Sequence, residues 1–381
     1  MARDIYLDYA ATGIMLPQAR EAYLHFSGDE YGNASGNHVR SRRAKAALSR
    51  LRRELADLLG CKAHEILFTS GGSEANNLAI KGSLLAQGLD QDSPTIFYSA
   101  LEHPSVIQSI RQVQELKCGR GIEIPLDESG GLEISKLADR IRGGHMLTLM
   151  AVNNELGFIQ PIEEISYFCR QAGVLFHCDA VQAATTMDLK PLVAASDSLS
   201  LSAHKFGGPL GVGILILKEN VEITPLITGG SQENARRAGT ENLPAIAGMI
   251  AALKQTIAVR EQLQDQFQAL EDALLAELKD CQGKYRYFGA NSLKTPHICS
   301  FLLHGHYAND ILMKLDLKGI CAASGSACST GNPEPSPLLL AMGIPAEEAK
   351  SLLRFSFGPS TTLEEVQLAG RTLAEILKAG S

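Results

Sequence analysis

Short apolar runs and longer stretches with helical spacing follow one another along most of this chain. Apolar runs at residues 66–69, 95–98, 146–152 and 174–178 are each followed by a polar or glycine-containing turn. Runs of this length predict buried strands, and the stretches between them predict helices. Strands that alternate with helices favour a mainly parallel sheet sandwiched by helices, so the predicted fold class is α/β.

The stretch 198–217 places a lysine between two further strand-like runs. Lys205 follows an alternating run that ends near residue 202, and a glycine-rich turn separates it from the apolar run 214–217. Burial between strands removes water from an amine and lowers its pKa toward that of a nucleophile that forms Schiff bases. The alternative is a solvated lysine on an ordinary loop between strands.

Polar side chains follow five of the predicted strands. They are Ser73, His103, Asn154, Asp179 and Lys205. In such sheets ligands bind outside the carboxyl ends of the strands, so we expect these side chains to line one edge of the sheet together. For Asp179 taken alone, a cap or turn residue is the alternative.

The turn at residues 70–74 joins the strand 66–69 to a helix predicted from Ala75 to Leu85. The N-terminus of a helix offers backbone amides and a favourable dipole to an anion such as phosphate. The alternative is an ordinary helix cap supplied by Ser73. The turn lacks the GxGxxG pattern, so the sequence does not support a dinucleotide site.

These side chains together match the needs of one kind of cofactor, a ring with an aldehyde, a basic ring nitrogen and a phosphate. The aldehyde needs a lysine, and the ring nitrogen needs a carboxylate so that it stays protonated and draws electrons. Lys205 and Asp179 meet these two needs, while Ser73 with Gly72 suits the phosphate and His103 suits the ring face. His204, beside the lysine, either binds phosphate or packs in the core.

A long helix is predicted from Pro244 onward, with an apolar stripe at helical spacing made of Leu263, Phe267, Leu270, Leu274 and Leu278. Short strands and helices follow it up to the end of the chain. We therefore predict a large domain over residues 15–260 and a smaller α+β domain formed by residues 1–14 and 261–381.

Two residues of the second domain carry further chemistry. Cys328 lies among small polar residues with no apolar strand around it, which is typical of an exposed loop and of a thiol that can act as a nucleophile. Arg354 lies within a strand-like apolar run, where its charge needs a carboxylate partner. An incidental loop cysteine and a structural ion pair are the respective alternatives.

Composition narrows the class of protein. The chain has 381 residues, 45% of them hydrophobic and 20% charged, with a formal net charge of −7. The absence of a basic tract argues against direct nucleic-acid binding, and no unbroken apolar run approaches the roughly 18 residues of a membrane span. The first residues do not form a signal peptide, and the eight cysteines lack a CxxC pair. We expect a cytoplasmic protein with reduced thiols, no disulfide framework and no metal site.

Motifs along nearly the whole chain are similar to those of a known family. They are YLDYAAT, TSGGSEANNLAIKG, the EH at 102–103, VNNELG, HCDAVQ, SLSAHKFGGPLGVG, RRAGTEN, SGSACS and RFSFG. The sequence resembles the cysteine desulfurases, in the class V aminotransferase group of fold-type I pyridoxal-phosphate enzymes. The segment after Cys328 resembles the longer catalytic loop of the NifS- and IscS-like branch.

The resemblance implies pyridoxal 5′-phosphate as cofactor and gives the matching residues their roles. Lys205 forms the internal aldimine, His103 stacks on the ring and assists acid–base steps, and Asp179 pairs with the ring nitrogen. Further cofactor contacts are implied for Gln182 on the ring hydroxyl and, on the phosphate, for Gly72, Ser73, Ser202 and His204. Thr240 is implied to reach the phosphate of the partner subunit's cofactor, which makes the protein a homodimer.

The implied reaction converts L-cysteine to L-alanine and leaves a persulfide on Cys328. Asn33, Asn154 and Arg354 would hold the substrate carboxylate, and a sulfur-acceptor protein, such as an iron–sulfur scaffold or a thiolation enzyme, would take the sulfur. The chain departs from the family at Ala34, where proline is usual, and at residues 233–236, where another glycine is common. The alternatives are a selenocysteine lyase or another class V aminotransferase, and a non-catalytic partner of sulfur proteins.

Overall fold

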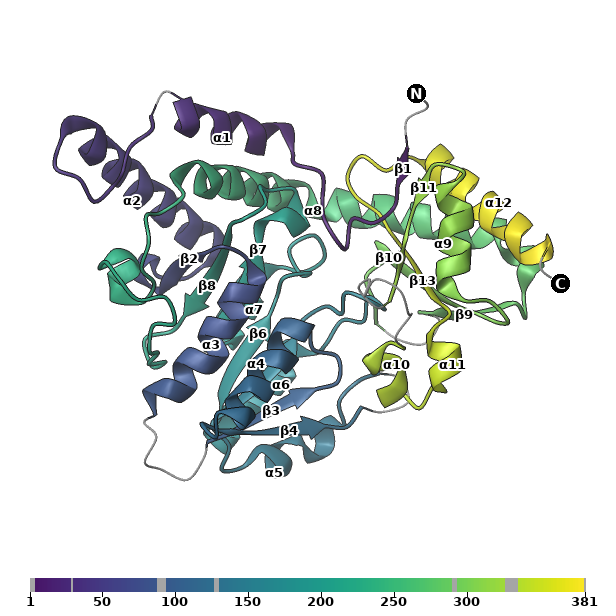
Figure 1. Ribbon diagram of the computed structural model, residues 1–381, viewed down its shortest axis with the longest axis horizontal. Coiled ribbons are helices and arrows are strands. Elements are labelled where there is room, and N and C mark those ends of the chain that lie inside the picture. Colours follow the sequence, from purple (N-terminus) through teal and green to yellow (C-terminus); the bar gives the residue numbers. More distant parts are fainter. Residues whose placement is uncertain are drawn as a thin grey trace.

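A computed structural model describes residues 4–28, 30–87, 94–126, 130–289, 293–325 and 335–379. Figure 1 shows a larger part built on a seven-stranded sheet, a smaller part beside it, and the long helix α8 running from one to the other. The N-terminal strand lies in the smaller part, next to segments from the end of the chain (Figure 1). The predicted α/β class is confirmed.

The large sheet has the strand order β2-β8-β7-β6-β5-β3-β4. Its strands are β2 (Ile66–Thr69), β3 (Thr95–Ser99), β4 (Arg120–Ile124), β5 (Met146–Met150), β6 (Leu175–Asp179), β7 (Ser198–Ser202) and β8 (Gly213–Leu217). Strands β7, β6, β5, β3 and β4 pair in parallel, while β8 is antiparallel to both β7 and β2. All strands except β8 therefore point the same way, and their carboxyl ends share one edge.

Strand β4 was not predicted, because its sequence lacks the continuous apolar run of a buried strand. Arg120, Glu123 and the glycine between them interrupt any apolar run, and the strand is largely exposed. It pairs with β3 alone, at the edge of the sheet. Edge strands bury little, so their hydrophobic pattern is weak.

Helices cover both faces of the sheet. Helices α3 (Gly72–Ala86) and α4 (Pro104–Glu115) pack on one face through two small apolar clusters. The larger core lies on the other face, and the helices packed around it are α1 (Pro17–Gly28), α2 (Val39–Leu59), α5 (Leu137–Ile141), α6 (Ile162–Ala172) and α7 (Leu189–Ala195). Because both faces are covered, strands such as β5, β7 and β8 are buried along their whole length.

Helix α8 (Leu243–Glu277) contributes to both parts of the molecule. Its buried side chains up to Leu253 belong to the core of the large sheet, while those from Leu263 onward belong to a second core. This second core contains all five residues of the predicted apolar stripe. The domain limits at residues 14/15 and 260/261 stay predictions.

By length and composition alone, α8 could cross a membrane, with a mean hydropathy of 1.2 over eighteen residues. However, 56% of that window is buried inside the molecule, and its apolar side chains fill the core. Its hydropathy is therefore what a core helix requires.

The smaller part is built around an antiparallel sheet of order β12-β13-β10-β9. Its strands are β9 (Tyr285–Phe288), β10 (Ile298–Leu303), β12 (Ala323–Ser324) and β13 (Leu352–Ser356). Its helices are α9 (Ala308–Asp316), α10 (Pro337–Ala341), α11 (Ala346–Ala349) and α12 (Leu363–Ala379). At the N-terminus, the two-residue strand β1 (Ile5–Tyr6) pairs in parallel with β11 (Ile320–Cys321).

Candidate active site

A cavity of about 550 Å³ lies at the carboxyl ends of the parallel strands, between the two parts of the molecule. The large part supplies most of its wall, and the rest comes from the N-terminal segment at residues 8–11 and from β12, β13, α9 and their flanking residues. Ten of the predicted site residues line it: Gly72, Ser73, His103, Asn154, Asp179, Gln182, Ser202, His204, Lys205 and Arg354. The expected gathering of side chains at one sheet edge is therefore observed.

Lys205 lies in a short 3₁₀ turn, Ala203–Phe206, that follows β7. Its Nζ donates to the carbonyl oxygens of Ala10 and Ala11 at 2.7 and 2.8 Å. Burial, together with the positive charge of Arg354, lowers the pKa of Lys205 to about 8, although Asp179 opposes the shift. The amine therefore has a substantial neutral fraction slightly above neutral pH, as a nucleophile requires.

Asp179 ends β6 and is 4% exposed. Its Oδ1 accepts the backbone N–H of Val181 at 3.0 Å, and its Oδ2 accepts Nδ2 of Asn76 at 2.7 Å. These two donors fix the carboxyl group at the floor of the cavity. A fixed carboxylate in this place can pair with a protonated ring nitrogen.

Helix α3 starts at Gly72, three residues earlier than predicted, with Gly71 as its N-cap. Gly72 and Ser73 therefore occupy the first turn, where backbone amides lack a partner within the helix. A Cβ atom on Gly72 would come within 2.6 Å of Val181, so only glycine lets this helix end approach the turn after β6. The result is an anion site of the kind expected for a phosphate.

The side chains of Ser202 and His204 complete this end of the cavity. Nδ1 of His204 lies 3.1 Å from Oγ1 of Thr12, which belongs to the N-terminal segment. Burial and the charge of Lys205 lower the pKa of His204 to about 4, so the ring is neutral at physiological pH. A neutral imidazole can still donate one hydrogen bond to a phosphate oxygen.

Arg354 reaches the opposite end of the cavity from β13. Its Nη2 pairs with Oδ1 of Asp8 at 2.7 Å, and its Nη1 donates to the backbone oxygen of Asn154 at 2.7 Å. Its Nε is buried and has no hydrogen-bond partner among the described residues. The guanidinium is thus held by both parts of the chain and retains a donor for a carboxylate.

Two of the predicted residues that the structure describes, Asn33 and Thr240, do not line this cavity. Asn33 is exposed, and its Oδ1 accepts the N–H of Ser35 within its own turn at 2.9 Å. Thr240 is exposed in the loop before α8. Cys328 lies outside the residues that the structure describes. The roles assigned to these three residues stay predictions.

Sequence reasoning missed several polar side chains that position the site. Asp8 and Asn76 line the cavity and bind Arg354 and Asp179, respectively. Glu102, next to His103, is fully buried, and burial with the nearby charge of Asp179 raises its pKa to about 8. Its Oε1 accepts the N–H of Met150 at 2.8 Å and so connects the turn after β3 to the end of β5. Glu102 and Asn76 belong to the same motifs as His103 and Ser73, and Asp8 belongs to the YLDYAAT motif, but only the fold shows what they contact.

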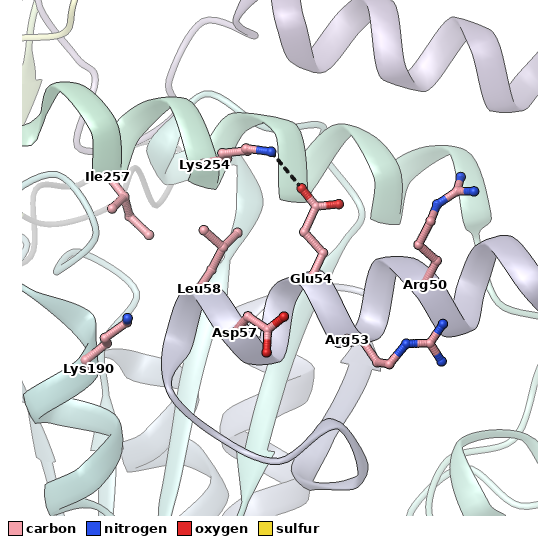
Figure 2. Close-up of a pocket in the computed structure, with 8 residues that line it drawn as sticks. All are labelled: Arg50, Arg53, Glu54, Asp57, Leu58, Lys190, Lys254 and Ile257. Atoms are coloured by element: carbon pink, nitrogen blue, oxygen red, sulfur yellow. Dashed lines mark hydrogen bonds and ion pairs between the residues drawn. The ribbon is translucent and has the colours of Figure 1, made fainter.

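A second hollow, of about 470 Å³, lies on the surface between α2, α7 and α8. Figure 2 shows its charged lining, in which Lys254 Nζ bonds Glu54 Oε1 at 3.0 Å. Lys254 is exposed, and none of the predicted site residues lines this hollow. Among the described residues, no group of three or more His, Cys, Asp or Glu side chains could hold a metal ion. The predicted site residues lie instead around the cavity that contains Lys205.

Comparison with known proteins matches this chain to one family. The model of the aminotransferase class-V family matches residues 5–368. A protein from Dictyoglomus turgidum named "Cysteine desulfurase IscS" is 36% identical over 99% of this chain and 95% of its own length. The chain belongs to the cysteine desulfurases of the class V aminotransferase family.

Other relatives of this desulfurase agree. The "Putative cysteine desulfurase IscS 1" of Bacillus subtilis is 35% identical over 98% of both chains. A solved structure named "NIFS-LIKE PROTEIN" superposes with a TM-score of 0.90 at 27% identity, covering 99% of this chain and all of that one. These matches confirm the predicted family and enzyme class, and the family depends on pyridoxal phosphate.

Proposed function

We propose that this protein uses pyridoxal phosphate to convert L-cysteine to L-alanine and places the sulfur on Cys328 as a persulfide. The observation that carries the proposal is the juxtaposition of Lys205, Asp179 and Arg354 in one cavity. The buried amine of Lys205 suits an aldehyde, and the fixed carboxyl group of Asp179 suits a ring nitrogen. The guanidinium of Arg354 has a remaining donor for a substrate carboxylate. The match to cysteine desulfurases supports cysteine as the substrate.

The residues present fit the cofactor. The free amides at the start of α3, with Ser73, Ser202 and His204, suit its phosphate, and Asp179 suits its ring nitrogen. Gln182 lines the cavity as well, and its Nε2 donates to the Ala10 oxygen at 2.7 Å. When bound, pyridoxal phosphate supplies an aldehyde for amines and an electron sink for the bonds at the substrate α-carbon.

Side chains of the cavity bind the substrate and take a proton from it. Arg354 and Asn154 orient the carboxylate of cysteine, and Asp8 and the Asn154 carbonyl hold the guanidinium in place. Lys205, with its lowered pKa, takes the proton from the α-carbon of the substrate at Nζ. Ala10 and Ala11 accept hydrogen bonds from the same nitrogen and so orient it.

The sulfur step belongs to Cys328. Its thiolate attacks the sulfur of the bound cysteine, a new S–S bond forms, and the bond between Cβ and sulfur breaks. The electron pair of the broken bond stays with the carbon fragment, which takes up a proton and leaves as alanine. The SGSACS motif, shared with the family, supports this role.

Two substitutions separate the two halves of the reaction. Lys205→Ala should lose the visible absorbance of the bound cofactor and all alanine formation. Cys328→Ser should keep the absorbance and lose persulfide formation, measured with ³⁵S-labelled cysteine. Cys321→Ser, a half-buried cysteine on β11, is the matched control and should behave as wild type. Wild-type sulfur transfer by Cys328→Ser would refute the mechanism.

We further propose that the protein acts as a homodimer and passes sulfur to an acceptor protein in the cytoplasm. The exposure of Thr240, outside its own cavity, supports a role in a partner subunit. Light scattering should give twice the 40.9 kDa chain mass. Chasing the labelled persulfide into cell proteins identifies the acceptor, whether an iron–sulfur scaffold or a thiolation enzyme. Comparing turnover of cysteine and selenocysteine tests the lyase alternative.

A further inference from the structure

A chain of polar side chains joins Asp179 to His103 along the wall of the cavity. Asn76, on α3, donates from Nδ2 to Asp179 Oδ2 at 2.7 Å and to Ser105 Oγ at 3.0 Å. Ser105 Oγ lies 2.8 Å from Nδ1 of His103. Asn76 is 1% exposed, and Ser105 and His103 are partly buried. The chain links two residues for which different roles on one cofactor are proposed.

The direction of each hydrogen bond follows from the chemistry of the groups. The side chain of Asp179 needs donors, so the amide nitrogen of Asn76 faces it and the amide oxygen faces Nε2 of His177 at 3.1 Å. Both amide protons of Asn76 are then used, one on Asp179 and one on Ser105. The hydroxyl of Ser105 accepts this proton and has its own proton to donate.

The backbone supplies a second and unambiguous donor to His103. His103 is the N-cap of α4, and its Nδ1 accepts the N–H of Ser105 at 3.1 Å. A backbone N–H can only donate, so Nδ1 must offer a lone pair. A neutral imidazole whose Nδ1 accepts carries its proton on Nε2. With Nδ1 engaged by α4, Nε2 is the ring nitrogen through which His103 can reach a group in the cavity.

We propose that Asn76 and Ser105 are positioning residues that hold His103 as the Nε2–H tautomer, so that its imidazole presents a hydrogen-bond donor to the substrate site. His103 then enters the reaction as a donor, and Lys205 is the group with a lone pair available for the substrate proton. The tautomer is a property of the chain itself, whereas its catalytic consequence rests on the proposed function.

Electrostatics favours a neutral ring. The charged groups that act on His103 are Asp179, which favours its protonation, and Lys205, which opposes it. Burial outweighs Asp179 and lowers the pKa of His103. Protonation would also place a hydrogen on Nδ1, where it would meet the N–H of Ser105.

The ring nitrogens can be observed directly by NMR. The cofactor-loaded protein, labelled with ¹⁵N-histidine, is recorded at neutral pH, and His103→Asn assigns the signals. We expect an unprotonated Nδ1 and a protonated Nε2 for His103. A proton on Nδ1, in either the other tautomer or the imidazolium ion, would overturn the proposal.

A pair of serine variants tests the positioning role. Ser105→Ala removes one donor to the neutral ring, so the titration midpoint of His103 should rise by about half to one pH unit. Ser109→Ala is the matched control, since Ser109 is buried on the same helix and its hydroxyl bonds only the Ser105 backbone oxygen among the described residues. It should leave the midpoint unchanged. An unchanged midpoint in Ser105→Ala would refute the role of its hydroxyl.

These measurements do not require turnover. If Cys328→Ser transfers sulfur normally while His103 shows the expected tautomer, the proposed function fails and the positioning role stands. If the desulfurase tests succeed while His103 carries its proton on Nδ1, only the positioning role fails.

Discussion

Arg354 and Asp8 form an ion pair of 2.7 Å that joins the last strand of the small sheet to the N-terminal segment. Only 7% of the Arg354 side chain is exposed, against 23% for Asp8. The pair holds the guanidinium in the cavity wall, and the Asn154 carbonyl fixes its second nitrogen. The arginine is therefore oriented before any substrate arrives.

We expect Arg354→Lys to raise the KM for cysteine about tenfold or more, with a smaller effect on kcat. Lysine keeps the positive charge but loses the planar fork that contacts Asp8 and Asn154 at once. Steady-state kinetics of alanine formation measures the two constants separately. A lower kcat at unchanged KM would place Arg354 outside the carboxylate site.

The pH dependence of Lys205 follows from its lowered pKa of about 8. Its neutral fraction, and hence its reaction with an aldehyde, should rise between about pH 7 and pH 9 in protein stripped of cofactor. Asp179→Asn removes a charge that raises the pKa, so the midpoint should move to lower pH. Reductive labelling with a small aldehyde, followed by peptide mass spectrometry, measures this reaction. Arg354→Lys keeps its charge and serves as the control.

The loop before α8 contains three consecutive non-glycine residues in the left-handed region, at Glu233, Asn234 and Ala235. For Ala235, with φ of 60°, this conformation costs about 1 kcal/mol relative to glycine. We expect Ala235→Gly to raise the free energy of unfolding by about 0.5–1 kcal/mol. The same change in a regular helix, Ala247→Gly, should lower it. Denaturant titration measures both.

Glu233 holds this loop in place despite its strain. Its buried carboxylate binds Arg52 through two contacts of 2.9 and 2.5 Å and accepts the N–H of Phe68 at 3.1 Å. Removing one partner of a buried ion pair leaves the other charge unpaired, so Glu233→Gln should cost about 3 kcal/mol of stability. A melting temperature equal to that of the wild type would show that the loop does not depend on this pair.

Phe267, the second residue of the apolar stripe, is fully buried in the second core. Phe267→Ala should lower the free energy of unfolding by about 3–5 kcal/mol, because it leaves a cavity among close-packed side chains. Leu317, which is 85% exposed, provides the control, and its replacement by alanine should be nearly neutral. Denaturant titration measures the midpoint of unfolding of each variant, and the midpoints are compared when the two variants have the same m-value.

The sequence was sufficient to predict the parts of the site that depend on strand order. Lys205, Asp179 and His103 each follow a strand, and a parallel sheet brings such residues to one edge regardless of packing details. Partners such as Asp8 could not be predicted in this way. The Asp8–Arg354 contact joins residues 346 positions apart, and no local pattern specifies it. Asn33 and Thr240 were predicted from motifs that match the family, but neither side chain lines the cavity of its own chain. A matching motif alone therefore does not show where a side chain lies.

The N-terminal segment has a consequence for how the protein is made. Strand β1 pairs with β11, whose residues are synthesised more than 300 positions later, because β11 begins at Ile320. Asp8 pairs with Arg354, which is synthesised later still. On the ribosome, Lys205 and Asp179 emerge long before these partners exist. The ion pair between Asp8 and Arg354, and with it this part of the cavity wall, can form only after Arg354 has been synthesised. The cavity is therefore completed after Lys205 and Asp179 are already present in the chain.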